Sequence, residues 1–376
     1  MRSSHPQLQT ILDKTPKSAA SRSKESAVIT GKRLQDIIHT FKNLHIGVVG
    51  DFFLDAYFDC DPILDEKSIE TGKTCYQVVR TRRYAGAAGT VAANLKALGV
   101  DKVDIVGFCG DDGEGYELRR AMVNLNLILE GFFPCPDRFT PTYGKPCYVD
   151  SGARNPNAIS ELERLDIKNR RSTPIAIQNK MMAYIRNHLD IWDGLVIVDQ
   201  VSTPNCGVLT SRMRRFLIGE SRCRPDLPVL VDSREHIHLF EHMILKPNQF
   251  EAARAVGRGR LKPTFKDSTE HAHALSTKAC CPVFLTLAEK GMLVANGPRV
   301  DHAPSFSVDG PTDPVGAGDS ASAALVASLS AGTTLLEAAD IGNIVASITV
   351  QQIGATGTAP PAQIKRRHRE IARHGL

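Results

Sequence analysis

The feature that most constrains the fold of this 376-residue chain is a series of short, uninterrupted apolar runs bounded by Gly, Asp or Asn. Continuous apolarity is typical of strands that are buried on both faces of a sheet. Stretches with helical periodicity lie between the runs, and this alternation predicts a mainly parallel, doubly wound α/β sheet flanked by helices. The predicted strands cover residues 45–51, 103–111, 194–200, 228–233, 243–248 and 282–288. The predicted helices cover residues 34–43, 90–98, 114–125, 175–189 and 208–218.

Two segments interrupt this alternation, residues 56–84 and 140–151. They contain short β-prone pieces, CYQVVRTRRY and KPCYVDS, separated by polar intervals. We therefore predict one large domain over residues 34–364, with a small β-strand lid formed by these two segments. The Ser-, Lys- and Thr-rich residues 1–33 are predicted to form a flexible basic extension, and residues 365–376 a basic C-terminal tail.

Charge and composition exclude several classes of function. The formal net charge is +5, but residues 1–33 carry +5 and residues 365–376 carry +4, so the body between them is net −4. With only 6% aromatic residues, this body lacks the basic, base-stacking surface of a nucleic-acid-binding protein. No apolar stretch reaches the roughly 20 residues of a membrane span, and the N-terminus lacks the apolar core of a secretory signal. We therefore expect a cytoplasmic protein that binds neither nucleic acid nor membrane.

The strongest local signal is the segment DPVGAGDSASAALVASLSAG, residues 313–332. Gly316, Ala317 and Gly318 can bring backbone amides close together, and the Ala-rich run predicts a helix whose positive N-terminal end faces the same space. This arrangement would bind an anion. Asp319 would repel a phosphate there unless it takes a proton from an attacking hydroxyl. The pattern therefore favours phosphoryl transfer, with capping of the helix as the alternative role for Asp319.

Other polar residues follow the predicted strands, where open α/β sheets bind their ligands. Asn248 and Glu251 lie three residues apart at a predicted helix start, so both can face one direction. Their oxygens suit Mg²⁺, and capping of the helix is the alternative role. The pattern GxxxxGK[ST] is absent from the sequence, which disfavours a P-loop NTPase. The remaining strand-end residues are Gly50, Asp51, Asp55, Asp199, Asp232 and Lys246. His236, His238 and His242 are predicted to lie in a solvated loop rather than in a metal site.

Six motifs, in unbroken order over about residues 34–360, resemble those of the ribokinase-like sugar kinases of the phosphofructokinase B family. They are GDFFLD (50–55), AGAAGTVAANLKALG (85–99), VGFCGDDGEG (106–115), KPNQFE (246–251), TLAEKG (286–291) and DPVGAGD (313–319). Within that family the chain is most similar to the kinase half of the bifunctional heptose-7-phosphate kinase/adenylyltransferases. The similarity lies in LDAY (54–57), ERLD (163–166) and VDQVST (198–203), and it does not extend to the adenylyltransferase half.

The resemblance implies an ATP- and Mg²⁺-dependent kinase in which Asp319 is the catalytic base. It implies that Gly316, Ala317 and Gly318 form the anion hole for the transferred phosphoryl group, and that Asp313 lies at a site for a monovalent cation such as K⁺. The implied Mg²⁺ ligands, partly through water, are Asn248 and Glu251. The implied nucleotide-binding residues are Lys246, Asn248, Glu251, Thr286, Gly291 and Asn343. The implied substrate contacts are Asp51, Asp55 and Gly86.

The expected reaction transfers the γ-phosphoryl group of ATP to a hydroxyl of a sugar or sugar phosphate, with heptose-phosphate-like acceptors included. One alternative is a nucleoside or vitamin kinase on the same fold. Another is a catalytically silent relative that binds a ligand and acts through its basic ends, although the intact GAGD sequence at residues 316–319 counts against it. The resemblance leaves a homodimer open as the assembly.

Overall fold

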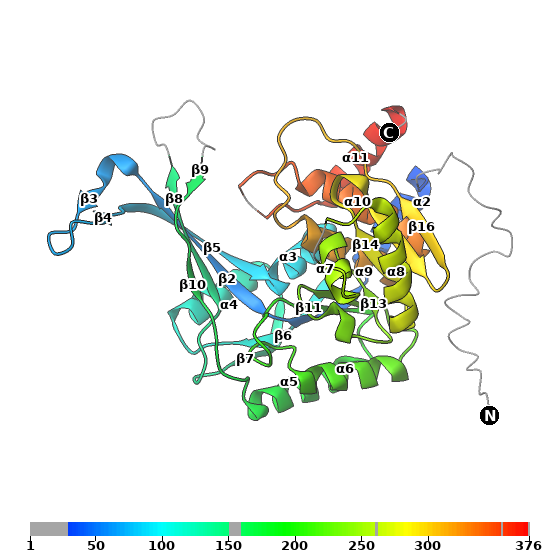
Figure 1. Ribbon diagram of the computed structural model, residues 1–376, viewed down its shortest axis with the longest axis horizontal. Coiled ribbons are helices and arrows are strands. Elements are labelled where there is room, and N and C mark those ends of the chain that lie inside the picture. Colours follow the sequence, from blue (N-terminus) through cyan, green and yellow to red (C-terminus); the bar gives the residue numbers. More distant parts are fainter. Residues whose placement is uncertain (1–28, 150–158, 260–261, 355, 375–376) are drawn as a thin grey trace.

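The computed structural model describes residues 29–149, 159–259, 262–354 and 356–374. One large sheet carries helices on both faces, and a smaller sheet projects from one side of this body (Figure 1). The predicted fold class, a mainly parallel α/β sheet with a separate small sheet, is confirmed.

The large sheet has nine strands, and each predicted strand is among them. The strands β7, β6, β1, β11, β12, β13 and β14, which are neighbours in this order, are parallel. Strands β15 and β16, which the apolar runs did not predict, are antiparallel and form one edge. In sheet order the strands are β16 (Arg299–Ala303), β15 (Met292–Asn296), β14 (Val283–Thr286), β13 (Ile244–Leu245), β12 (Val229–Ser233), β11 (Gly194–Asp199), β1 (His45–Gly50), β6 (Lys102–Cys109) and β7 (Ile128–Pro134).

The two faces of this sheet belong to two separate apolar cores. Val48 and Val198 pack into one core, whereas Val49 and Ile197 point to the opposite face and pack into the other. Alternate side chains of a strand point to opposite faces, so a strand covered on both sides needs an apolar residue at every position. This explains the uninterrupted apolar runs in the sequence.

Helices cover both faces, and each predicted helix is present within a few residues of its predicted ends. None of the helices in the described residues is both long and apolar enough to cross a bilayer. The helices of the first core are α2 (Gly31–Phe41), α3 (Ala88–Leu98), α4 (Gly113–Asn124), α9 (Ala317–Ser330), α10 (Leu335–Thr349) and α11 (Pro361–His374). The helices of the second core are α5 (Ile175–His188), α6 (Ser211–Cys223), α7 (Gln249–Ala255) and α8 (Phe265–Ala279).

The small sheet contains the two segments predicted to form a lid, up to residue 149. It also includes two strands after them, β9 and β10, which the sequence did not predict. In sheet order its strands are β10 (Leu165–Ile167), β8 (Thr142–Val149), β2 (Phe52–Cys60) and β5 (Val78–Ala87), with β9 (Ile159–Glu161) paired to β8. A two-stranded ribbon, β3 (Glu66–Lys67) and β4 (Thr74–Cys75), lies between β2 and β5 in the chain (Figure 1). Residues 150 and 151 lie outside the described residues.

Both predicted domain boundaries differ from the structure. Helix α2 begins at Gly31 rather than at residue 34, because the Thr30 side chain accepts a hydrogen bond from the Arg33 amide and caps the helix. At the other end, residues 365–374 belong to α11 and are not a solvated tail. Ile371 is buried in the first core, and the ring of His368 contacts the carbonyl oxygen of Ile29. The basic residues that suggested a tail occupy the outer face of an amphipathic helix.

Candidate active site

Asp319 lies in the first turn of α9, which begins where the GAGD sequence predicts a helix. The N-cap residue is Gly316, with a φ of +79°, a left-handed conformation that favours glycine. A Cβ at this position would also lie 3.2 Å from the Cγ2 atom of Thr356. Because Gly316 occupies the N-cap, Asp319 does not cap this helix, and the alternative role considered for it from the sequence is wrong.

The amides around Gly316 form only part of the predicted anion hole. The first N–H groups of a helix have no acceptor within the helix, and they favour negative charge nearby. In this structure the Ala317 amide donates to the carbonyl oxygen of Pro314 at 3.2 Å. The amides of Gly318 and Asp319 follow it in the first turn, and they are the stronger candidates for contact with a phosphoryl group.

Asp319 is half-buried, and loss of solvation is the main reason why its pKa is raised to about 7. The charge of Asp232 raises this pKa further, whereas the charges of Lys246 and Arg234 oppose the shift. A carboxylate with a pKa near neutrality can accept a proton and release it again under physiological conditions. The electrostatics of Asp319 therefore suit a general base.

The raised pKa predicts a pH dependence of turnover. Only the ionised carboxylate can accept the proton of an attacking hydroxyl, so kcat/KM for the acceptor, which reports the free enzyme, should rise with pH through about 7 and level off above it. The measurement is kcat/KM from about pH 5 to about pH 9, with circular dichroism at each pH as a check on folding. A kcat/KM that is as high at about pH 5 as at about pH 8 would contradict the assignment of the base.

Lys246, which follows β13, forms an ion pair beside Asp319. Its Nζ atom lies 2.9 Å from Oδ2 of Asp232, and the Ser322 hydroxyl donates to the same oxygen at 2.9 Å. Burial lowers the pKa of Lys246, but the charges of Asp232, Glu251 and Asp319 more than offset it, so the ammonium is retained. A Cβ at Gly318 would lie 3.7 Å from this nitrogen. One cation therefore lies among three carboxylates against the start of α9.

Asn248 and Glu251 form a capping box at the start of α7. The Asn248 side chain accepts hydrogen bonds from the amides of Phe250 and Glu251, and Glu251 Oε2 accepts one from the Asn248 amide at 2.8 Å. The capping role considered from the sequence is therefore present. It leaves Oε1 of Glu251 outside the box, and burial and the charge of Asp232 raise the pKa of this carboxyl.

This set of residues is compatible with Mg²⁺ at the predicted position. Asp232, Glu251 and Asp319 outnumber the single buried cation, and a divalent ion would offset the excess negative charge. Among the described residues no group of three or more His, Cys, Asp or Glu side chains could hold a metal by itself. That agrees with the usual coordination of Mg²⁺, which keeps several waters and binds one or two carboxylates together with substrate phosphates.

The other residues predicted to bind the nucleotide or a cation also have structural contacts. Asp313, the residue predicted to bind a monovalent cation, accepts a hydrogen bond from the Val315 amide on Oδ1 at 3.0 Å and one from the Gly354 amide on Oδ2 at 3.2 Å.

Three residues predicted to bind the nucleotide also have structural contacts. Thr286 forms a β-bridge with Asn248, next to the capping box. Gly291 has a φ of +87°, and a Cβ there would lie 2.3 Å from the carbonyl oxygen of Ala303. The Asn343 side chain donates to the carbonyl oxygens of Ala303 and Pro304. Their roles in binding ligands stay predictions.

The small sheet contributes a further carboxylate to this region, Asp55 of β2. Its Oδ1 lies 3.4 Å from the Nζ atom of Lys145 on the neighbouring strand β8. A Cβ at Gly86 would lie 2.8 Å from Asp55 Oδ2, so a residue without a side chain is needed there. Asp55 contributes to the raised pKa of Asp319, which brings the predicted substrate residues and the predicted base into one site.

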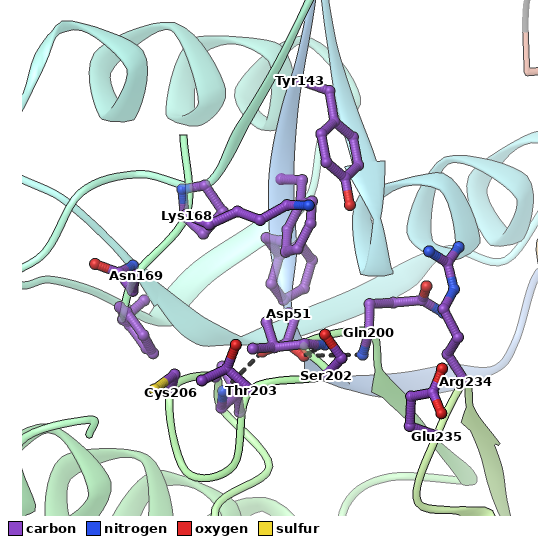
Figure 2. Close-up of a pocket in the computed structure, with 17 residues that line it drawn as sticks. Asp51, Tyr143, Lys168, Asn169, Gln200, Ser202, Thr203, Cys206, Arg234 and Glu235 are labelled. Carbon is purple, nitrogen blue, oxygen red and sulfur yellow. Dashed lines mark hydrogen bonds between the residues drawn. The ribbon is translucent and has the colours of Figure 1, made fainter. Parts of the chain in front are cut away.

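A cavity of about 140 Å³ adjoins this site, between the small sheet and the loops after β11 and β12. Figure 2 shows the Lys168 amino group and the Tyr143 hydroxyl turned toward the space above Asp51. Lys168 is paired with Asp166 at 2.9 Å, whereas no carboxylate in the described chain is within ion-pairing distance of the Arg234 guanidinium. The polar lining includes Tyr143, Lys168, Gln200, Ser202, Thr203 and Arg234.

The cations of this region were missed in the sequence. Arg234 follows the predicted strand-end residue Asp232 by two positions, so its place at the carboxyl end of β12 could have been found. Lys145 lies in a segment predicted to form the lid. Lys168 follows the unpredicted strand β10, and no local signal marks it.

The prediction that the three histidines lie in a solvated loop is wrong for His236, because its Nδ1 atom lies 3.2 Å from Asp199 Oδ2.

Comparisons with known proteins show what this chain, and part of this site, is similar to. Residues 228–362, which contain Asp232, Lys246, the capping box and Asp319, match the family model described as "pfkB family carbohydrate kinase". The chain is 27% identical to the "Bifunctional protein HldE" of Geobacter metallireducens over 342 residues, 89% of this chain and 64% of that protein. It is 29% identical to the protein of the same name from Citrifermentans bemidjiense, over 83% of this chain and 61% of that protein. The chain thus spans less than two thirds of these relatives.

Solved structures share the fold. The Escherichia coli phosphofructokinase-2 in complex with fructose-6-phosphate superimposes with a TM-score of 0.66 at 16% identity, over 88% of this chain and 100% of that one. The Arabidopsis thaliana ribokinase complexed with ribose and ATP gives a TM-score of 0.62 at 17% identity, over 86% and 98% of the two chains. The fold is therefore that of the ribokinase-like kinases, and residues 228–362 are similar to the pfkB family of carbohydrate kinases.

Proposed function

We propose that this chain transfers the γ-phosphoryl group of ATP to a hydroxyl group of a sugar phosphate. The observation that carries the proposal is the position of Asp319, a half-buried carboxylate with a pKa of about 7 in the first turn of α9. The charges of the buried cation Lys246 and of the small-sheet carboxylate Asp55 both act on it. A base, an anion-binding helix start and an acceptor site therefore adjoin each other.

The residues divide the reaction among them. Asp319 accepts the proton of the acceptor hydroxyl. The oxygen of this hydroxyl forms the new bond to the γ-phosphorus of ATP, while the bond between the γ-phosphorus and the oxygen that bridges it to the β-phosphate breaks. The first-turn amides of α9 and the Lys246 ammonium bind the charge that develops on the transferred group. Asp55 accepts hydrogen bonds from acceptor hydroxyls and thereby orients the attacking oxygen. Asn248 and Glu251 would hold Mg²⁺ through water, and the ion would neutralise phosphate charge.

A phosphorylated acceptor is supported by two cations, Arg234 and Lys168, which line the cavity together with the carboxylates of Asp51 and Glu235. In the described chain no carboxylate is within ion-pairing distance of the Arg234 guanidinium, and Lys168 and the Tyr143 hydroxyl face the cavity (Figure 2). Arginine is well suited to bidentate binding of a phosphate. One structural neighbour was solved with fructose-6-phosphate, and several similar proteins carry the name "Bifunctional protein HldE". The sequence motifs resemble those of the bifunctional heptose-7-phosphate kinase/adenylyltransferases. We propose a heptose-phosphate-like acceptor within this class.

The direct test is ADP release from ATP with a panel of neutral sugars, sugar phosphates and nucleosides. We expect the highest kcat/KM for sugar phosphates, and a heptose 7-phosphate among the best acceptors. Preference for a neutral sugar would contradict the phosphorylated acceptor but not the kinase. Absence of turnover with every acceptor would contradict the proposed function.

Replacing Arg234 by Gln should discriminate between acceptors. Loss of a charged hydrogen-bonding group typically costs about 1.5–3 kcal/mol, so KM for a sugar phosphate should rise roughly tenfold to a hundredfold. KM for the corresponding neutral sugar should stay within about threefold, because only the phosphate loses its partner. Steady-state kinetics with both acceptors provides the measurement. Arg258→Gln is the matched control, since Arg258 is exposed and pairs with Glu270 away from the cavity. Equal losses with both acceptors would rule out phosphate binding by Arg234.

A further inference from the structure

Asp51 was predicted to contact the sugar, but its carboxylate is occupied by the backbone of the loop after β11. Oδ2 accepts hydrogen bonds from the amides of Gln200 at 2.9 Å and Val201 at 3.1 Å, and Oδ1 accepts one from the Val208 amide at 2.7 Å. The residue is only 4% exposed. Burial and the charge of Asp199 raise its pKa to about 6, which leaves it ionised at neutral pH. These are charge-assisted bonds, which are stronger than neutral ones.

The loop held by Asp51 forms one wall of the cavity. Gln200, Ser202 and Thr203 line the cavity from this loop, between the two ends that Asp51 binds. Close approach of the carboxylate requires Gly207, where a Cβ would lie 2.5 Å from Asp51 Oδ1. Figure 2 shows Asp51 beneath the open space, with its hydrogen bonds directed into this loop.

A second buried carboxylate holds the other wall. Asp199 Oδ2 accepts the Ser233 hydroxyl at 2.8 Å and lies 3.2 Å from His236 Nδ1, while the Asp199 carbonyl oxygen accepts the Arg234 amide at 3.1 Å. These contacts lie on both sides of Arg234 and Glu235, which line the cavity. The two carboxylates thus follow neighbouring strands, β1 and β11, and each binds one cavity segment.

We propose that Asp51 and Asp199 are positioning residues for acceptor specificity, which hold the two loop segments of the cavity in place without binding the acceptor themselves. The kinetic part of this inference rests on the proposed function, whereas the structural part does not. Acceptor affinity then depends on the shape of residues 200–208 and 233–236, because Arg234 and the polar side chains are aligned only when both segments are held.

The first experiment is hydrogen exchange in the ligand-free protein. In Asp51→Asn an amide group replaces one acceptor oxygen and faces backbone N–H donors, so exchange at residues 200–208 should be about tenfold faster or more. Gly207→Ala should have a similar effect, because its methyl group displaces Asp51 without altering the charge. Gly219→Ala is the matched control, since a Cβ there meets nothing within 4 Å. If Asp51 only bound the sugar directly, neither substitution would alter the exchange of residues 200–208 in the ligand-free protein. Unchanged exchange in both variants would therefore overturn the proposal.

The second experiment measures kinetics with a heptose 7-phosphate as the probe. We expect both variants to raise the KM of this acceptor about tenfold or more, with kcat within about threefold and the KM of ATP unchanged. Faster loop exchange with an unaltered acceptor KM would overturn the role in specificity. If the wild-type protein phosphorylated no acceptor, the proposed function would fail, and the exchange measurement would still decide whether Asp51 holds the loop.

Discussion

Replacing Asp319 by Asn is expected to lower turnover by about 10²-fold to 10⁴-fold, which is the usual range for loss of a general base. The amide of Asn cannot accept the proton of the acceptor hydroxyl, although it has nearly the same size and fits the same position at the start of α9. The affinity for ATP should stay within about threefold, because the base acts on the acceptor and not on the nucleotide.

The measurement combines single-turnover kinetics with calorimetric titration of ATP into both proteins. Asp309→Asn is the matched control, since Asp309 is an exposed carboxylate ten residues before Asp319. The control should keep wild-type turnover. Wild-type turnover in purified Asp319→Asn would refute the assignment of Asp319, and a loss confined to ATP affinity would place this residue on the nucleotide side of the site.

The second large effect is expected on stability, from the buried ion pair between Asp232 and Lys246. The side chain of Lys246 would lose its closest counter-charge in Asp232→Ala, while the residue itself is only 3% exposed. Removing one partner of a buried pair typically costs about 3–5 kcal/mol, because the other charge stays in a medium that solvates it poorly. Glu251 and Asp319 offset part of this cost, so we expect a decrease of about 3 kcal/mol in the free energy of unfolding.

Urea denaturation of the variant and the wild type measures this difference. Glu270→Ala is the matched control, because it breaks the exposed pair between Glu270 and Arg258 and should cost less than about 1 kcal/mol. The double variant Asp232→Asn/Lys246→Met removes both charges of this pair, so it should regain part of the stability without regaining turnover. If Asp232→Ala cost no more than the control, the ion pair would not be a source of stability.

Much of the fold was predictable because its causes are local in the sequence. A strand covered by helices on both faces is apolar along its middle, and this property of residues 46–49, 194–198 and 229–231 is visible without any tertiary contact. The start of α9 is equally local, since Gly316 provides the left-handed conformation and the alanine run provides the helix. Strands β15 and β16 escaped detection because they lie at an edge, where β16 is partly exposed and its apolar pattern is broken.

Motif spacing also predicted which residues gather at the site, but not all of their contacts. Asp55 and Gly86 lie 31 positions apart and meet because β2 and β5 pair, as the motifs implied. Asn248 and Glu251 form a capping box through local geometry, whereas the Asn343 amide donates to two carbonyl groups about 40 residues away in the chain. These residues carry structural bonds that a motif does not reveal.

The amino-acid sequence by itself determined the layered α/β fold and the start of helix α9, in whose first turn the proposed base Asp319 lies. These follow from hydrophobic periodicity and glycine conformation, which are properties of neighbouring residues. Only the tertiary structure decided that Asp51 holds a loop 150 residues away, that Asp232 pairs with Lys246, and that Lys168 and Arg234 face one cavity. Such contacts depend on strand order and loop closure, because the packed sheet brings together side chains that are distant in the chain.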